Sequence, residues 1–117
     1  MRNDNVIQAK SFAFAVRIIE LYQQLSKKKE FVLSKQILRS GMSIGANVEE
    51  AIGAQSRLDF LHKLGIAYKE ARETLYWLRL LKETNYLSEN EFKSYCSDND
   101  ELCRIIGSIQ RTTKANS

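Results

Sequence analysis

The chain has 117 residues, of which 44% are hydrophobic and 27% are charged, a balance typical of one folded domain and not of a disordered segment. It contains no proline and only five glycines, so it lacks the turn residues that an all-β sandwich or barrel needs and instead favours long helices. The formal net charge of +4 is compatible with anionic partners but does not establish them.

Apolar residues recur at spacings of three and four in four consecutive segments, the pattern of helices with one buried face. We predict helices over residues 5–26, 31–55, 56–84 and 88–113. The first ends before Lys27, Lys28 and Lys29, whose charges suit the negative end of a helix dipole. Short connections between helices of similar length favour an all-α, up-down-up-down antiparallel four-helix bundle, formed by a single domain over residues 1–117.

Local signals mark the starts of the third and fourth helices. Ser56 is an expected N-cap with Asp59 three residues later, and Ser88 and Glu91 form a capping-box pair. Both pairs satisfy backbone N–H groups that a helix leaves without partners in its first turn.

The last three helices each carry an apolar seam that we expect to face the core. The predicted seam residues are Ile37, Gly41, Ile44, Val48 and Ala51, then Leu61, Leu64, Tyr68, Ala71, Leu75 and Leu78, then Tyr95, Leu102, Ile106 and Ile109. Within the fourth helix, Asp98, Asn99 and Asp100 compete for backbone hydrogen bonds. We nevertheless expect that helix to be continuous.

The first and third helices carry more apolar surface than one bundle seam requires. Apolar residues of the first helix cover an arc of roughly 220° at 100° per residue. On the third, a second stripe lies on the expected solvent side. Such stripes usually mark partner surfaces, so we predict self-association, the alternative being that loops of the same chain cover them. The residues expected at the interface are Phe14, Ile66, Trp77, Leu80 and Leu81.

A run of small residues lies in the middle of the second helix. Glycine costs about 1 kcal/mol in a helix interior. Gly41 and Gly45 therefore indicate either a close approach of two backbones or a local kink, and the sequence leaves both open.

Metal and cofactor chemistry finds little support in the sequence. Cys96 and Cys103 are separated by roughly 10 Å along one helix face, beyond disulfide reach, and we expect reduced core residues. The single histidine, His62, cannot complete a zinc site with two such thiols, so we predict no metal or cofactor. The polar, charged N-terminal segment resembles neither a signal peptide nor a membrane span, and we expect a cytoplasmic protein.

Three glutamates, Glu50, Glu70 and Glu73, lie in helix centres near apolar seams. We favour ion pairing over acid–base catalysis, because no histidine or nucleophile joins them in a triad-like arrangement, and we expect no enzyme activity. The candidate ion-pair partners are Arg39, Arg72 and Arg79.

Two groups of basic residues are candidate sites for phosphate contacts. One group lies at an end of the bundle and the other along one side of the fourth helix, although a merely solvated charged face is the alternative. No helix-turn-helix, zinc-finger or aromatic strand signature is present, so any binding would depend on backbone electrostatics. The candidate nucleic-acid-binding residues are Lys27, Lys28, Lys29, Lys35, Lys93, Arg104, Arg111 and Lys114.

Two stretches of the chain read QILRSGMSIGANVEEA (residues 36–51) and IAYKEARETLYWL (residues 66–78). They resemble the four-helix-bundle family of proteins encoded in intervening sequences of bacterial 23S rRNA genes, and the resemblance extends over nearly the whole chain. Ser43, Ile44 and Asn47 match family positions in the first stretch. Gly45 and Ala46 stand where many relatives have proline or another small residue.

The resemblance implies a left-handed antiparallel bundle that assembles as a homopentamer. The accessory protein of diversity-generating retroelements is similar and binds nucleic acid and a reverse transcriptase, so RNA, DNA or such a protein are the partners to expect. No catalytic residue follows from the resemblance. Three hypotheses therefore stand: an oligomeric nucleic-acid-binding scaffold, a protein adaptor without direct nucleic-acid binding, and an enzyme using His62 or the central glutamates.

Overall fold

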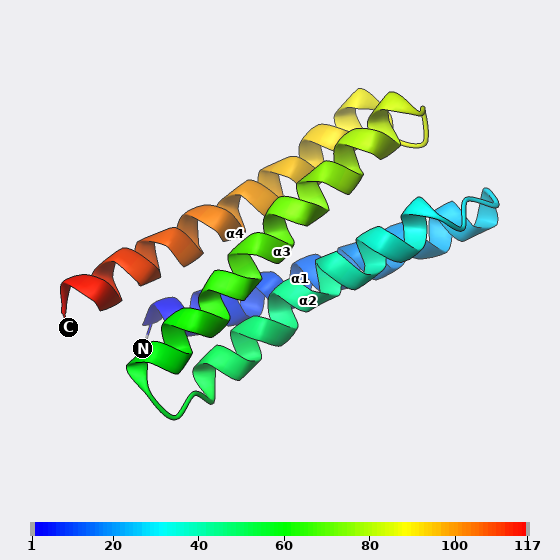
Figure 1. Ribbon diagram of the computed structural model, residues 1–117. Helices are drawn as coiled ribbons and strands as arrows, with labels where there is room; N and C mark the ends of the chain where they lie inside the picture. Colours follow the sequence, from blue (N-terminus) through cyan, green and yellow to red (C-terminus); the bar gives the residue numbers. More distant parts are fainter. Residues whose placement is uncertain (1, 117) are drawn as a thin grey trace.

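The computed structural model describes residues 2–116, with side chains described from residue 6 onward. Its helices run antiparallel to their neighbours along the chain, so the predicted up-down-up-down four-helix bundle is confirmed (Figure 1). α1 packs beside α2 and α4, and α3 also packs beside α2 and α4, which leaves α1 and α3 on one diagonal. The bounds are α1 Arg2–Lys27, α2 Leu33–Ile52, α3 Arg57–Glu83 and α4 Glu89–Ala115.

The predicted N-terminal caps of α3 and α4 are present. The Ser56 hydroxyl accepts a hydrogen bond from the Asp59 N–H at 3.0 Å. In the capping box of α4, the Glu91 N–H donates to the Ser88 hydroxyl at 3.1 Å and the Ser88 N–H donates to the Glu91 carboxylate at 2.9 Å. α4 continues without a break through Asn99, as expected.

α2 is shorter than predicted, because its first turn is capped from outside the helix. It begins at Leu33 and ends at Ile52, whereas residues 31–55 were expected. The Glu30 carboxylate accepts hydrogen bonds from the N–H groups of Val32, Leu33 and Ser34 at 3.1, 3.0 and 2.7 Å. This arrangement holds the preceding residues in a turn and satisfies the free donors at the helix start.

The same hydrogen bonds set the charge state of Glu30. Burial would raise the pKa of its carboxyl, but the backbone N–H groups of Leu33, Ser34 and Val32, with the Ser34 side chain, outweigh burial and lower the pKa below 4.5. A lowered folded-state pKa means that the carboxylate stabilises the fold above its unfolded pKa and loses that effect as pH falls through the folded value.

We therefore expect Glu30→Gln to lower the free energy of unfolding by about 1 kcal/mol at neutral pH, because an amide cannot accept all three bonds. The gap from wild type should shrink in acid, as the pH falls through the lowered pKa of the Glu30 carboxyl and the wild-type side chain loses its charge as well. Urea unfolding at neutral pH and in acid measures both effects. Glu20→Gln, a change at an exposed carboxylate on α1, is the control, and a gap that persists unchanged in acid would contradict the capping role.

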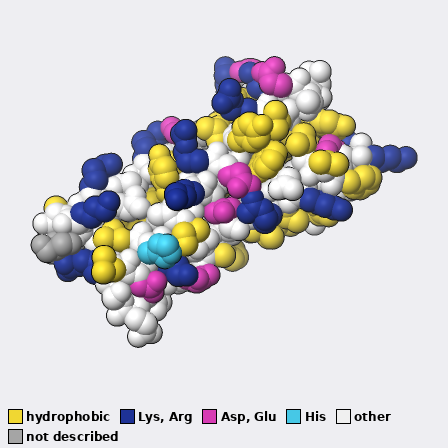
Figure 2. Space-filling view, in the orientation of Figure 1, with side chains coloured by type: hydrophobic (Ala, Val, Ile, Leu, Met, Phe, Trp, Pro, Cys, Tyr) yellow, Lys and Arg dark blue, Asp and Glu magenta, His cyan; other side chains and the backbone are white. Residues whose placement is uncertain are grey.

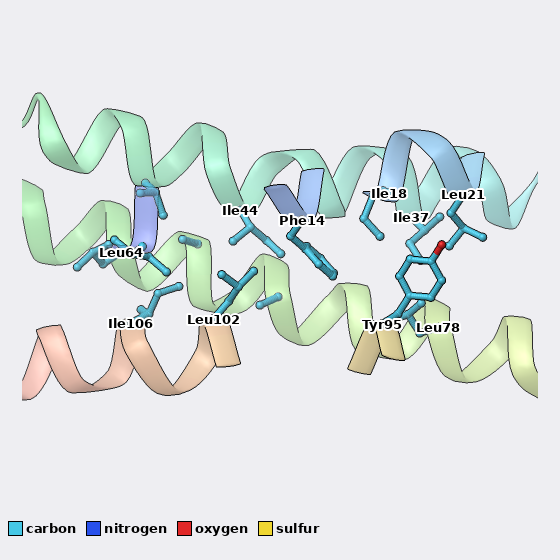
Figure 3. Close-up of a cluster of buried hydrophobic side chains, with 14 of the residues drawn as sticks. Phe14, Ile18, Leu21, Ile37, Ile44, Leu64, Leu78, Tyr95, Leu102 and Ile106 are labelled. Atoms are coloured by element: carbon cyan, nitrogen blue, oxygen red, sulfur yellow. The ribbon is translucent and has the colours of Figure 1, made fainter. Parts of the chain in front are cut away.

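The core fills the space between the four helices (Figure 3). All predicted seam residues of α2 and α4 are buried. On α3 the prediction is partly wrong: Leu64, Ala71 and Leu78 are buried, but Tyr68 is 37% exposed. Asn99 is a buried polar residue that the seam pattern missed, and its Nδ2 donates to the Ala71 carbonyl at 3.1 Å, linking α4 to α3.

Glycines in α2 allow close contact with α1. A Cβ atom at Gly41 would lie 2.7 Å from Cγ2 and 2.8 Å from Cγ1 of Ile18. At Gly45, it would lie 3.4 Å from the backbone oxygen of Ser11. Of the two interpretations left open for these glycines, close helix approach is the correct one for Gly41.

Candidate nucleic-acid interface

Most acidic side chains are engaged by cations or by helix caps. Lys10 contacts Glu101 at 3.1 Å and Arg17 contacts Asp98 at 2.6 Å, both between α1 and α4. Further ion pairs join Lys63 to Glu50, Lys82 to Glu89, and Arg104 to Asp100. Glu30 and Glu91 are committed to helix caps. The acidic groups are thus largely neutralised within the fold.

Many basic side chains, in contrast, make no ion pair with a described acidic residue. No described carboxylate contacts these groups, which leaves them accessible to an anionic ligand. They are Lys27, Lys28, Lys29, Lys35, Arg57, Lys69, Arg72, Arg79, Arg111 and Lys114.

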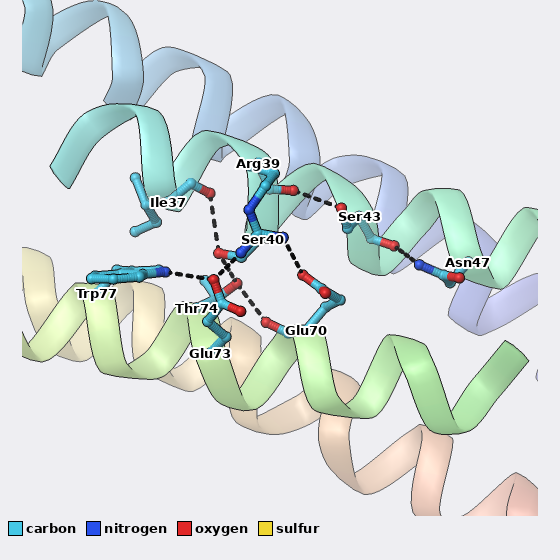
Figure 4. A network of polar contacts seen from close by, with 9 residues as sticks. All are labelled: Ile37, Arg39, Ser40, Ser43, Asn47, Glu70, Glu73, Thr74 and Trp77. Carbon is cyan, nitrogen blue, oxygen red and sulfur yellow. Dashed lines mark hydrogen bonds and ion pairs between the residues drawn. The ribbon is translucent and has the colours of Figure 1, made fainter. Parts of the chain in front are cut away.

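A polar network links α2 to α3 (Figure 4). Arg39 reaches across from α2 and contacts Glu70 at 3.1 Å and also Glu73. The Trp77 indole N–H donates to the Glu73 carboxylate at 2.9 Å. The expected ion pairing is therefore confirmed for Arg39. It is wrong for Arg72 and Arg79, which make no ion pair with a described carboxylate and line hollows beside α4.

Arg72 instead lines a groove on the outer side of α3 and α4. One hollow of this groove has a volume of about 410 Å³ and includes Tyr68, Arg72, Arg104 and Arg111. Gly107 forms part of its floor, and a Cβ there would lie 3.3 Å from Nη1 of Arg111, so the guanidinium lies against the helix backbone. Arg104 is held by Asp100 at 2.9 Å. In this hollow, the predicted Arg104 and Arg111 of α4 lie together with Tyr68 and Arg72 of α3.

A second hollow of about 450 Å³ lies further along the same two helices. Its lining includes Tyr76, Arg79 and Leu80 from α3 and Phe92 from α4. A smaller hollow that contains Leu75 and Asp100 lies between the two. Lys and Arg side chains are interspersed with hydrophobic ones over the face that α3 and α4 form in Figure 2. We call the three hollows together the α3–α4 groove.

The lysine cluster, Lys27, Lys28, Lys29 and Lys35, is exposed at the connection between α1 and α2. Lys28 Nζ donates to the Tyr86 carbonyl at 3.5 Å, so this cluster lies at the same end of the bundle as the connection between α3 and α4. The other two predicted basic residues are both exposed: Lys93 is 4.0 Å from Glu89, and Lys114 lies in the last turn of α4.

The predicted self-association residues lie deeper than expected. Phe14 is 2% exposed and Leu81 is fully buried, so both are core residues and the interface prediction is wrong for them. Ile66, Trp77 and Leu80 are partly buried. α3 packs against both α2 and α4, and its second stripe is covered in part by those neighbours within the same chain.

One exposed apolar surface lies on the outer side of α1 and α2. Phe12 is 69% exposed, and Val16 and Ile19 follow it at helical spacing. Phe12 and the exposed Met42 of α2 also line one shallow hollow of about 180 Å³. We call Phe12, Val16, Ile19 and Met42 the α1–α2 strip.

Metal-ligating and reactive groups are sparse. Among the residues that the structure describes, no three His, Cys, Asp or Glu side chains gather closely enough to hold a metal ion. Burial, with a smaller contribution from Asp100, raises the pKa of both the Cys96 and the Cys103 thiols, which disfavours the reactive thiolate. Over residues 2–116, no helix is both long and apolar enough to span a membrane.

These features define an all-helical bundle protein with a basic groove. Residues 3–108 match the family model of the 23S rRNA-intervening sequence protein, and the chain belongs to this family. A crystal structure of a protein of unknown function from the S23 ribosomal protein family of Bacteroides thetaiotaomicron is 54% identical, with a TM-score of 0.92. That match covers 93% of this chain and 98% of the other. No curated protein matches the chain.

Sequence reasoning missed four groove residues on α3, which are Tyr68, Arg72, Tyr76 and Arg79. It assigned Tyr68 to the core and Arg72 to an ion pair. A usable signal was present, because Tyr68, Arg72, Tyr76 and Arg79 follow one another at intervals of four, four and three residues and so share one helix face.

Proposed function

We propose that this protein is a non-enzymatic, self-associating scaffold that binds nucleic acid, RNA or DNA, through its basic surface. The observation that carries this proposal is the excess of cations without ion-pair partners, which gather in the lysine cluster and the α3–α4 groove. Phosphates of a nucleic acid can pair with such cations and release bound counterions to solution. The family's association with 23S rRNA genes, which its name records, supports the same class of ligand.

The assignment as a non-enzyme is supported by the state of the central glutamates. Glu70 and Glu73 are both engaged by Arg39, and Glu73 also accepts the Trp77 N–H. Glu50 pairs with Lys63. Carboxylates paired in this way link α2 to α3, which is a structural role.

Self-association is supported by the α1–α2 strip. An exposed aromatic side chain with aliphatic neighbours along one helix face gains free energy when a second copy removes it from water, at about 25 cal/mol per Å² of apolar surface. The family resemblance favours a pentamer. In a ring of subunits each basic surface is repeated, which strengthens the attraction for a long polyanion.

The test is a salt series of binding to duplex DNA and structured RNA, with light scattering of the same sample to fix the subunit count. We expect the affinity to fall steeply with salt. Replacing Lys28 and Lys29 by glutamine should weaken binding and reduce the logarithmic salt slope by about one for each phosphate that the protein no longer neutralises. Lys10→Gln is the matched control, because Lys10 is already paired with Glu101.

An adaptor that recruits another protein, such as a reverse transcriptase, is the second candidate. The exposure of Phe12 favours it, since the α1–α2 strip could equally meet a different chain. A folded oligomer that binds neither RNA nor DNA at low salt would overturn the scaffold proposal. Binding of a purified partner protein that Phe12→Ala weakens would then establish the adaptor.

A further inference from the structure

We infer that the α3–α4 groove binds single-stranded nucleic acid, whose bases stack on Tyr68 and Tyr76 while arginines between and beside them hold the phosphates. This assignment rests on the proposed nucleic-acid binding and names the form of nucleic acid that one surface recognises. Beside the lysine cluster, by contrast, the exposed Phe31 is not part of an alternating row of rings and cations.

The two tyrosines form an exposed row on α3. Tyr68 is 37% exposed and Tyr76 is 53% exposed, and each lines one of the two larger hollows of the groove. They are eight residues apart, or about 12 Å along the helix axis. Arg72 lies between them and Arg79 follows Tyr76, so ring and guanidinium alternate along the row. This interleaving of stacking faces and cations is what binding of single strands requires.

The arginines of the groove are available for an anionic ligand. Arg72, Arg79 and Arg111 form no ion pair with any acidic residue in the described part of the chain. Asp100, at the groove, is neutralised by Arg104. Glu83 is the remaining acidic residue of the lining and lies at the end of α3, beyond Arg79. The central part of the groove is therefore positive.

A single strand fits this arrangement better than a duplex does. In a duplex the bases are stacked and paired inside, and only phosphates and base edges face a protein surface. A single strand can turn a base face toward an exposed ring, and stacking tolerates any base because every base has such a face. The groove should consequently bind single strands of mixed sequence.

The sole tryptophan provides a direct optical signal for this binding. Trp77 packs edge-on against Tyr76, with ring centroids 5.1 Å apart. A base that stacks on Tyr76 changes the surroundings of the indole, and its fluorescence reports on occupation of the groove itself.

The experiment is a fluorescence and anisotropy titration of the full-length protein with a mixed-sequence single-stranded oligonucleotide and with the duplex of equal length at one salt concentration. We expect tighter binding of the single strand, accompanied by a change in Trp77 emission. Tyr76→Leu and Tyr68→Leu should each weaken single-strand binding at least about fivefold while leaving duplex binding unchanged. Tyr76→Phe keeps the ring and should retain binding.

Tyr22→Leu on α1, diagonally across the bundle from α3, is the matched control, and circular dichroism verifies that each variant folds. Equal binding of single strand and duplex, with the Tyr68 and Tyr76 variants behaving as the control, would overturn the groove assignment and leave general nucleic-acid binding intact. Loss of oligomerisation in these variants, with unchanged oligonucleotide binding, would identify the groove as a subunit contact and also overturn it. Failure of both nucleic acids to bind would remove the proposed function as well.

Discussion

Replacing Phe14 by alanine should lower the free energy of unfolding by about 3–5 kcal/mol, whereas Phe12→Ala should change it by less than about 0.5 kcal/mol. The two rings are two residues apart on α1, but Phe14 is 2% exposed and Phe12 is 69% exposed. Figure 3 shows the Phe14 ring directed between the helices among core side chains such as Ile44 and Leu102. Its removal leaves a cavity that the neighbours fill only in part.

The same pair of variants separates folding from self-association. Urea unfolding followed by circular dichroism at a low protein concentration gives the stability of the single chain, and light scattering gives the subunit count. Phe12→Ala is expected to reduce the subunit count while the chain stays folded. An unchanged oligomer in that variant would show that the α1–α2 strip is not the subunit contact. A small effect of Phe14→Ala would place that ring outside the core.

The fold could be predicted because the capping residues and the apolar periodicity of the sequence indicate the same helices. Capping residues at Ser56 and Ser88 and apolar seams at helical spacing require no knowledge of the partner helix. The predicted seams of α2 and α4 lacked three buried polar residues, Ser34, Ser40 and Asn99. Asn99 was missed because a periodic pattern of apolar residues cannot identify a polar side chain that finds a carbonyl, here that of Ala71, on another helix.

α3 was harder to predict because it packs against two neighbours, α2 and α4. Residues between two adjoining contact faces can be buried or exposed according to the exact rotation of the helix. Leu81 was placed on an outer stripe and is buried, while Tyr68 was placed in the seam and is 37% exposed. A helix that packs against two neighbours has more than one apolar face, so a single apolar stripe does not predict its buried residues.

The two parts of the candidate site also differ in how well the sequence predicts them. The lysine cluster was predictable because consecutive lysines at a connection remain exposed in almost any packing. The α3–α4 groove was not, because it depends on which residues of α3 and α4 line the same hollows. Arg39 engages Glu70 and Glu73 from thirty or more positions earlier in the chain, whereas Arg72 and Arg79 make no ion pair with a described carboxylate. Ion pairs between helices depend on tertiary contacts, and the spacing of residues within one helix does not predict them.

The second large effect is expected at Gly41. Gly41→Ala should lower the free energy of unfolding by about 2 kcal/mol, although alanine is the better helix former by about 1 kcal/mol. The added methyl group would lie within 3 Å of Cγ1 and Cγ2 of Ile18. Both atoms branch directly from Cβ, so the side chain cannot move them aside without an unfavourable rotamer, and α1 and α2 must separate. Thermal and urea unfolding measure the loss.

Gly65→Ala in α3 is the matched control. A Cβ atom there meets only Nε2 of Gln110 at 3.8 Å, an ordinary contact, so the better helix propensity of alanine should raise stability by about 0.5–1 kcal/mol. The Ile18→Ala background provides the decisive comparison. Once the branched side chain is gone, Gly41→Ala should be neutral or stabilising, and a double-mutant cycle should give a coupling of about 2 kcal/mol. If Gly41→Ala were equally harmful with and without the Ile18 side chain, its cost would arise within α2 and not from the close contact with α1.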